Sequence, residues 1–260
     1  MTAYTKTPTQ KGRGSQLQTF GTGVSSWSRL AALQVDSKTV CWERIVSLKR
    51  RHPAAVAFDI MRTKVLKSAR EENWRTIGIT APVAGGGKST VAANLAISLS
   101  KHEKLRVVLV DLDLRSPRLA QMLAHKGQYS VEEFLRGQCP IEDFFVRLGD
   151  NLAIGASPEP GGRDLTEVLH SSGTAHMLEL MRDDLAADIV IYNLPPLLAG
   201  DDCLGLLPLV EASLLVVGAD FNTVADIDVC ESLLQSRTNL LGVVLNKCRY
   251  RTEAYADFLA

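Results

Sequence analysis

Short, almost wholly apolar runs alternate with segments of helix length along most of this 260-residue chain. Runs of this kind, without polar alternation, are typical of parallel strands that helices cover on both faces. The intervening segments, 91–101 and 225–235 among them, are long enough for helices. We therefore predict a doubly wound α/β domain with a mostly parallel sheet. Its six predicted strands span residues 75–80, 105–111, 151–156, 188–193, 212–218 and 240–246.

The first part of the chain has a different composition. Residues 1 to about 25 are rich in Thr, Gln, Gly and Ser, and such a sequence buries too little apolar surface to offset the entropy of ordering. Residues 1–50 contain eight Lys and Arg against Asp36 and Glu43. We predict a flexible basic N-terminal arm or linker over residues 1–43. The segment 27–51, which carries Trp27, is either a linker that partly docks on the domain or a basic surface for a membrane.

Composition argues against several classes of protein. Lys plus Arg and Asp plus Glu both total 29, and the domain has no basic cluster, so we expect no nucleic acid as a partner. No N-terminal stretch resembles a signal peptide, and Pro208 and Glu211 interrupt the most hydrophobic run, 204–219. Widely spaced cysteines without a C-x-x-C pair indicate reduced, buried thiols in a cytoplasmic protein: Cys41, Cys139, Cys203, Cys230 and Cys248.

The segment 81–90 reads APVAGGGKST and directly follows a predicted strand. A strand, a glycine-rich loop and a helix form a phosphate-binding loop, in which backbone N–H groups and the helix dipole attract an anion. Lys88 would reach the β- and γ-phosphates, and Ser89 would bind Mg²⁺. Pro82 stands where the usual pattern has its first glycine, so a glycine-rich turn with an incidental lysine is the alternative. The predicted loop residues are Ala84, Gly85, Gly86, Gly87, Lys88, Ser89 and Thr90.

Two carboxylates stand at the end of the next predicted strand. Asp111 and Asp113 lie two residues apart at the carboxyl edge of the sheet, where the phosphate loop also lies. Buried acids are unfavourable without a cation or a donor, and Mg²⁺ with phosphate supplies both. The alternative is that they cap a helix after Pro117. We predict Ser89, Asp111 and Asp113 as the residues that hold the metal.

Asn193 ends a third strand and precedes the sequence Leu-Pro-Pro. In phosphate-loop nucleotide sites, a carboxylate normally occupies this position and accepts a hydrogen bond from Mg²⁺-bound water. An amide oxygen still accepts, but it brings no charge to the cation, so we expect weaker metal binding or slower turnover.

Together these motifs resemble the bacterial tyrosine kinases and kinase-like partners of polysaccharide chain-length regulators, within the MinD/ParA-like class of P-loop proteins. The resemblance runs from about residue 44 to residue 247. It rests on the loop at 85–89, the D-x-D-x-R element at 111–115, N-L-P-P at 193–196 and G-V-V-L-N-K at 242–247. The resemblance implies a P-loop nucleotide-binding, kinase-like domain over residues 44–260.

The resemblance implies ATP and Mg²⁺ as cofactors and gives roles to single residues. The two carboxylates would serve Mg²⁺ and activate the incoming hydroxyl, while Lys88 and Arg115 would steady phosphate charge. The implied nucleotide site also includes Asn193 and Asn246, the latter near the adenine. The implied catalytic residues are Lys88, Asp111, Asp113 and Arg115.

The resemblance also implies a cellular role and a partner. The chain would act in the synthesis and export of exopolysaccharide or capsule, together with an inner-membrane chain-length regulator. It would be cytoplasmic and peripheral to the inner membrane through that partner, with a homo-oligomer as an option.

Three departures from the family bear on activity and assembly. The family's phosphate acceptor is a tyrosine-rich C-terminal tail, whereas only Tyr250 and Tyr255 follow the last predicted strand here. The helix before the first strand has Val56, Asp59 and Arg62 in place of E-x-x-R-x-x-R, the motif used for ring assembly. The amide in place of the usual carboxylate is the third departure.

Two alternatives to an efficient autokinase follow. One is an ATP-dependent regulatory partner of the same machinery with weak or no phosphotransfer. The other is a MinD/ParA-like ATPase, against which Val83 counts, because those proteins carry an extra lysine at this position.

Overall fold

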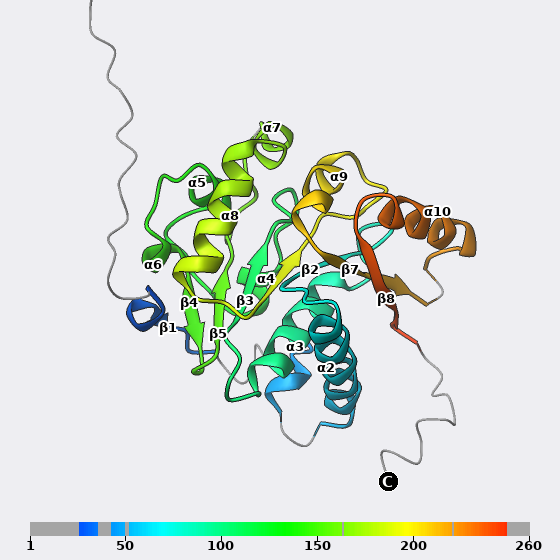
Figure 1. The fold of residues 1–260 in the computed structure, drawn as a ribbon, viewed down its shortest axis with the longest axis horizontal. Coiled ribbons are helices and arrows are strands. Elements are labelled where there is room, and N and C mark those ends of the chain that lie inside the picture. The colour runs from blue at the N-terminus through cyan, green and yellow to red at the C-terminus, as the bar shows by residue number, and fades with distance from the viewer. Residues whose placement is uncertain (1–25, 36–42, 50–51, 163, 220, 249–260) are drawn as a thin grey trace, which may run out of the picture.

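The computed structural model describes residues 26–35, 43–49, 52–162, 164–219 and 221–248. The predictions made for the arm over residues 1–25, for Cys41, and for Tyr250 and Tyr255 as acceptors lie outside these residues. The described residues form a single sheet with helices on both of its faces (Figure 1).

The sheet has the strand order β1-β4-β5-β3-β6-β2-β7-β8. Neighbouring strands pair in parallel except β4 and β5, which are antiparallel. Every predicted strand is present with its ends within two residues of the expected bounds, which confirms the doubly wound, mostly parallel fold. β1 and β4 escaped prediction because two and three residues are too few to form a pattern. The strands are β1 Ala31–Ala32, β2 Thr76–Thr80, β3 Val107–Asp111, β4 Val146–Leu148, β5 Leu152–Gly155, β6 Ile189–Asn193, β7 Ala212–Gly218 and β8 Asn239–Asn246.

Local signals start the long helices. α2 has Pro53 at its first position, and the His52 side chain accepts a hydrogen bond from a backbone N–H of the first turn. α10 starts with a capping box between Thr223 and Asp226. The helices are α2 Pro53–Glu71, α3 Lys88–Ser100, α4 Leu119–Met122, α5 Val131–Leu135, α6 Ile141–Phe144, α7 Leu165–Leu169, α8 Ser172–Asp184, α9 Asp202–Leu206 and α10 Val224–Gln235, with 3-10 turns at Ser26–Arg29, Val46–Leu48 and Leu207–Leu209.

Two hydrophobic cores lie on opposite faces of the sheet. In β3, Val107 and Leu109 belong to the core that contains α2 and α3, whereas Val108 and Val110 belong to the core that contains α5, α8, α9 and α10. This alternation follows from the two-residue period of a strand. Because both faces are covered, the strands read as continuous apolar runs, which is the pattern that made them visible in the sequence.

The described part of the N-terminal segment packs on the domain. Trp27 and Leu30 are buried in the second of these cores, and β1 pairs with β4. The indole Nε1 of Trp27 donates a hydrogen bond to the carbonyl of Asp150 at 3.2 Å. The docked-linker interpretation is therefore confirmed for these residues, and the membrane-surface interpretation is wrong for Trp27, which is 5% exposed. The boundary between residues 43 and 44 stays a prediction.

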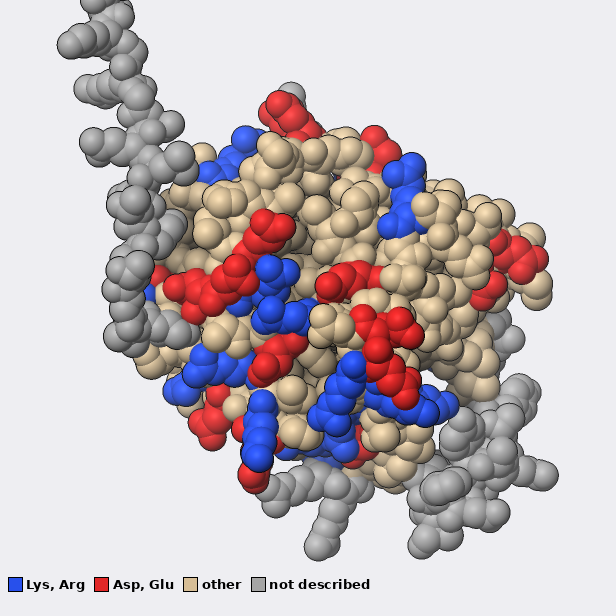
Figure 2. All heavy atoms as spheres, in the orientation of Figure 1, with Lys and Arg blue, Asp and Glu red and all other residues tan. Residues whose placement is uncertain are grey.

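The surface carries charges of both signs (Figure 2), and three of the cysteines in the described residues are buried. Figure 2 shows basic and acidic side chains interspersed over one face of the molecule. Cys139, Cys203 and Cys230 are buried, as predicted. The prediction of a buried thiol is wrong for Cys248, which is exposed because it lies beyond the end of the edge strand β8. Among the described residues, no helix is long and apolar enough to cross a membrane.

Candidate nucleotide site

The glycine-rich loop joins β2 to α3 at the carboxyl edge of the sheet. Gly85 and Gly87 have φ values of +91° and +92°, which side-chain-bearing residues rarely adopt. A Cβ on Gly87 would stand 2.1 Å from Nδ2 of Asn246, so only glycine fits there. The loop backbone is therefore shaped by its glycines, as the sequence predicts for a phosphate loop.

The N-terminus of α3 points its first-turn N–H groups into this loop. No side chain caps the helix at Gly87, and the first N–H groups of a helix have no partner within the helix. Lys88 and Ser89 are buried in the first turn, whereas Ala84 and Gly85 are exposed at the outer rim of the loop. This arrangement suits an anion at the helix N-terminus.

Lys88 forms a buried ion pair with one of the predicted carboxylates. Its Nζ lies 2.5 Å from Oδ2 of Asp113, and the two side chains are 8% and 6% exposed. A charge buried this deeply is tolerated only with a partner of opposite sign. The structure thus brings Lys88 and Asp113 together as expected, and each compensates the other inside the loop.

Asp111 is fully buried and has several hydrogen-bond donors. Its Oδ2 accepts from the backbone N–H groups of Arg118 and Leu119 at 3.1 and 3.0 Å. Burial raises the pKa of Asp111 above its ordinary value, and the positive charge of Lys88 opposes that rise. The capping alternative therefore describes Asp111 in this structure, since α4 begins at Leu119.

Asn193 connects Asp111 to the phosphate loop. The two residues are partners in the β3–β6 register, and Nδ2 of Asn193 donates to Oδ1 of Asp111 at 2.7 Å and to Oγ of Ser89 at 3.2 Å. The Oδ1 atom of Asn193 is buried and has no hydrogen-bond partner among the residues that the structure describes. A buried acceptor without a donor is uncommon, and a cation-bound water would satisfy it.

These side chains fit Mg²⁺ that arrives with a nucleotide. Within the described ranges, no three His, Cys, Asp or Glu side chains gather into a ready-made metal site. Mg²⁺ usually takes one or two carboxylates and completes its shell with water and phosphate oxygens. Ser89, Asp111 and Asp113 lie around the buried Lys88 and the unsatisfied Asn193 oxygen, a donor set of this kind.

Arg115 lies in a separate polar cluster between the loop after β3 and two helices. Its guanidinium donates to the carboxylate of Asp202 in α9 and to Oγ1 of Thr166 in α7, the latter at 2.9 Å. Thr166 in turn donates to Asp202 at 2.6 Å. The Arg115 hydrogen bond holds the pKa of Asp202 below its ordinary value. Thr166 and Asp202 could not be predicted from the sequence, because no motif connects them to Arg115.

A second group of side chains borders the loop on the β7–β8 side. Asn246 donates from Nδ2 to the carbonyl of Gly86 at 2.9 Å. The Phe221 ring lies 3.1 Å from the point where a Cβ of Gly85 would stand, and Nζ of Lys247 lies 5.6 Å from the centre of that ring. Phe221 is 52% exposed. Phe221 was not predicted as a site residue, because the only indication in the sequence is its position just after a buried strand.

A glycine loop between a parallel strand and a helix, with a buried lysine and with carboxylates at the end of the next strand along the chain, defines a P-loop nucleotide-binding domain. The chain belongs to the CobQ/CobB/MinD/ParA nucleotide-binding domain family (CbiA), whose model matches residues 77–260. This match covers β2 through β8 and so includes the loop and both carboxylates.

Several curated proteins are similar to this chain. The succinoglycan biosynthesis transport protein ExoP of Rhizobium meliloti is 32% identical over 71% of the chain. AmsA of Erwinia amylovora is 24% identical over 89%, and the tyrosine-protein kinase YwqD of Bacillus subtilis is 27% identical over 72%. The chain spans 24% of the length of ExoP, 33% of AmsA and 78% of YwqD.

The fold is also found in a solved kinase domain. The kinase domain of Escherichia coli tyrosine kinase ETK superposes with a TM-score of 0.68 at 24% identity, over 76% of this chain and 78% of that domain. This likeness concerns the fold, since the identity is low.

Proposed function

We propose that this chain is an ATP·Mg²⁺-binding, tyrosine-kinase-type component of exopolysaccharide or capsule synthesis and export. The buried Lys88–Asp113 pair beneath an uncapped helix N-terminus, with Asp111 alongside, carries the proposal. The names of ExoP and YwqD support the setting and the reaction. The proposed partner is an inner-membrane chain-length regulator, which would hold the cytoplasmic chain at the membrane.

The proposed mechanism divides the work among the residues of the loop. ATP·Mg²⁺ supplies the phosphoryl group and the cation that neutralises its charge. The backbone N–H groups of the loop and the first turn of α3 bind phosphate oxygens, and Lys88 balances their charge. Ser89, Asp111 and Asp113 would hold the cation. Asp111 or Asp113 would accept the proton of the tyrosine hydroxyl as the tyrosine oxygen bonds to the γ-phosphorus and ADP leaves. Catalysis of this kind rests on positioning and electrostatics.

The acceptor test uses the full chain with ATP·Mg²⁺ and the cytoplasmic segment of the membrane partner. Phosphate should appear on Tyr250 or Tyr255 and be located by mass spectrometry. The Asp113→Asn variant should show none under the same conditions. Absence of phosphotyrosine in the wild-type chain, despite bound ATP, would remove the kinase proposal and leave nucleotide binding standing.

The Asn193 amide favours a second candidate, an ATP-dependent regulatory partner with weak or no phosphotransfer. A neutral side chain donates to Asp111 and Ser89 where a carboxylate would attract the cation. Asn193→Asp should raise Mg²⁺-dependent turnover if the missing charge limits the reaction. Unchanged or lower turnover would favour the regulatory candidate, as would normal polymer production by the Tyr250→Phe/Tyr255→Phe variant.

Two further parts of the proposal concern assembly. A homo-oligomer fits the proposed role, but Asp59 and Arg62 form an ion pair with each other at 2.8 Å and contact Ser98 of α3 within the same chain. These side chains are therefore already engaged. Val83 continues to count against a MinD/ParA-like ATPase, and we expect no nucleic acid as a partner.

A further inference from the structure

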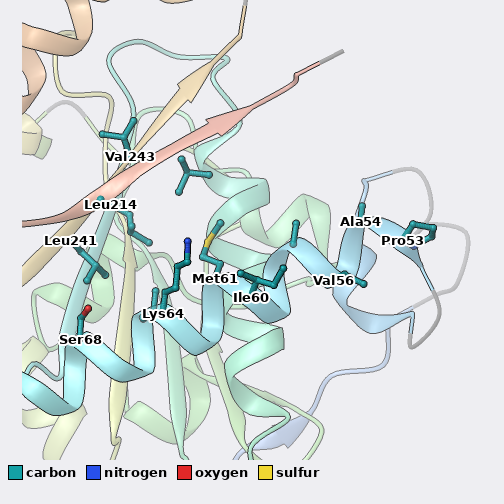
Figure 3. Close-up of a pocket in the computed structure, with 14 residues that line it drawn as sticks. Pro53, Ala54, Val56, Ile60, Met61, Lys64, Ser68, Leu214, Leu241 and Val243 are labelled. Carbon is teal, nitrogen blue, oxygen red and sulfur yellow. The ribbon is translucent and has the colours of Figure 1, made fainter. Parts of the chain in front are cut away.

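An apolar groove of about 570 Å³ lies between α2 and β8, away from the phosphate loop (Figure 3). Val56, Ile60 and Met61 line it from α2, and Leu241 and Val243 line it from β8. Figure 3 shows these side chains on facing elements, with the Lys64 side chain between them. The groove is therefore a distinct surface with a mainly apolar lining.

The groove lies where no helix of the described residues covers the sheet. α10 packs against β7 and β8 on one face, whereas α3 covers the central strands on the other face and α2 packs against α3. β8 is the edge strand, and its Val243 and Leu245 are 44% and 61% exposed. A sheet of this class normally buries both faces.

We propose that residues 252–260 of this chain dock in the groove. The described chain leaves β8 at Asn246 and ends at Cys248, and the sequence continues with Tyr-Arg-Thr-Glu-Ala-Tyr-Ala-Asp-Phe-Leu-Ala from residue 250. Tyr255, Phe258 and Leu259 stand at positions i, i+3 and i+4, the spacing of one helix face. This apolar stripe matches the lining of the groove.

The length of the connection allows the tail to return to the groove. Val244 lines the groove near the end of β8, the described chain runs on to Cys248, and Tyr255 follows Cys248 by seven residues. Seven residues span up to ~24 Å when extended, which exceeds the roughly 14 Å that four residues of extended chain place between Val244 and Cys248. A tail that turns back after Cys248 therefore reaches the part of the lining formed by Val243 and Val244.

The polarity of the tail also favours this occupant. Glu253 and Asp257, four residues apart, lie on the opposite face of such a helix from its apolar stripe, so they would face water when the stripe is docked. Lys64 is exposed on the groove side of α2. The aliphatic part of the Lys64 side chain would extend the apolar contact.

Docking of the tail would cover Tyr255, one of the two proposed phosphate acceptors. This regulatory consequence rests on the proposed function, whereas the docking itself does not. Phosphate on Tyr255 would add charge next to an apolar lining, and desolvation of that charge opposes docking. The groove would thus favour the unmodified tail.

Cross-linking of the full-length chain tests the docking without nucleotide. Ala57→Cys places a thiol in the groove and Phe258→Cys places one on the tail, in a chain that also carries Cys41→Ser and Cys248→Ser. A short bismaleimide should join the two residues within one chain. Equal mixing of isotope-labelled and unlabelled protein then distinguishes bonds within a chain from bonds between chains.

Matched variants give the expected size of the effect. Glu179→Cys, on exposed α8 at the opposite face of the sheet, replaces Ala57→Cys as the control and should give at least about tenfold less product. Leu259→Asp in the Ala57→Cys/Phe258→Cys chain should lower the yield by about tenfold, and Ala260→Asp, off the apolar stripe, should not. Equal yields for both cysteine pairs would overturn the proposal. Mixed isotope content in about half of the cross-linked products, the share expected for random pairing between chains, would also overturn it and assign the groove to a second copy.

Discussion

The phosphate loop and the groove beside β8 lie on the same sheet but differ in the polarity and the burial of their side chains. In the loop, Lys88, Asp113 and Asp111 are buried and already have partners within the chain. In the groove, side chains such as Val243 remain in contact with water although they are apolar. A ligand of the loop must compete with existing polar contacts, whereas an occupant of the groove needs only to displace water. The two regions should therefore respond differently to substitution.

The largest effect is expected from Lys88→Ala. Removal of the lysine leaves Asp113 as an uncompensated buried charge, and breaking such a pair costs about 3–5 kcal/mol of unfolding free energy. Nucleotide affinity should also fall by more than about a hundredfold, because charge-assisted phosphate contacts are lost. Urea unfolding and titration with a fluorescent ATP analogue measure the two quantities.

A double variant separates these two effects. Lys88→Ala/Asp113→Ala should regain most of the stability, since neither charge remains, yet should not regain nucleotide binding. Lys104→Ala, on an exposed turn, serves as the control and should change neither quantity. Restored binding in the double variant would show that Lys88 serves the fold alone.

Gly87→Ala should have the next largest effect. The residue has positive φ, and its new Cβ would collide with the Asn246 side chain 2.1 Å away. Gly149→Ala is the matched control, because Gly149 has φ of +67° and no atom near its Cβ position, so it should lose only about 1–2 kcal/mol. A larger loss at Gly87 in thermal or urea unfolding measures the contact between the loop and β8. Equal losses in the two variants would mean that this contact has no energetic weight.

A smaller effect distinguishes a covered groove from an open one. Val243→Lys in the groove should lower the unfolding free energy by about 1 kcal/mol more than Val229→Lys on α10, if the groove is occupied in solution. The wild-type valines are similarly exposed, at 44% and 50%. Equal urea midpoints for the two variants would mean that no segment covers the groove and that it is open to water.

The smallest expected effect is the pH dependence of the Arg115 cluster. Because the pKa of Asp202 is lowered in the folded state, its contribution to stability is present above the ordinary value of 3.8 and is lost as pH falls through the lower folded value. Asp202→Asn and Arg115→Gln should each flatten the acid side of the stability curve. An acid side as steep as that of the wild-type chain in both variants would mean that this cluster adds no pH-dependent stability.

The fold could be predicted well from the sequence because each strand and the glycine loop leave a pattern within a short stretch of residues. The strands are buried on both faces, so each reads as an apolar run, and the glycine loop is confined to ten adjacent residues. β1 could not be predicted, because a two-residue strand leaves no periodic signal. The docking of the segment with Trp27 was one of two interpretations that the sequence left open, and only the fold decides between them.

The contents of the site were only partly predictable. The motif indicated that Lys88, Asp111 and Asp113 gather at one edge of the sheet. It did not indicate that Lys88 forms its ion pair with Asp113 rather than with Asp111. The Arg115 cluster joins residues 51 and 87 positions apart in sequence, so only the fold brings them together. Phe221 was missed because an aromatic residue after a strand is far more often structural than functional.

The register between Asp111 and Asn193 bears on the balance of charge within the fold. With an amide at residue 193, Lys88 faces two acids and the local formal charge is −1, whereas a third acid would make it −2. The amide also donates to both Asp111 and Ser89. Because the amide limits the repulsion that a bound cation would otherwise have to neutralise, chelation of divalent cations should leave the melting temperature unchanged, and a lower melting temperature would contradict this.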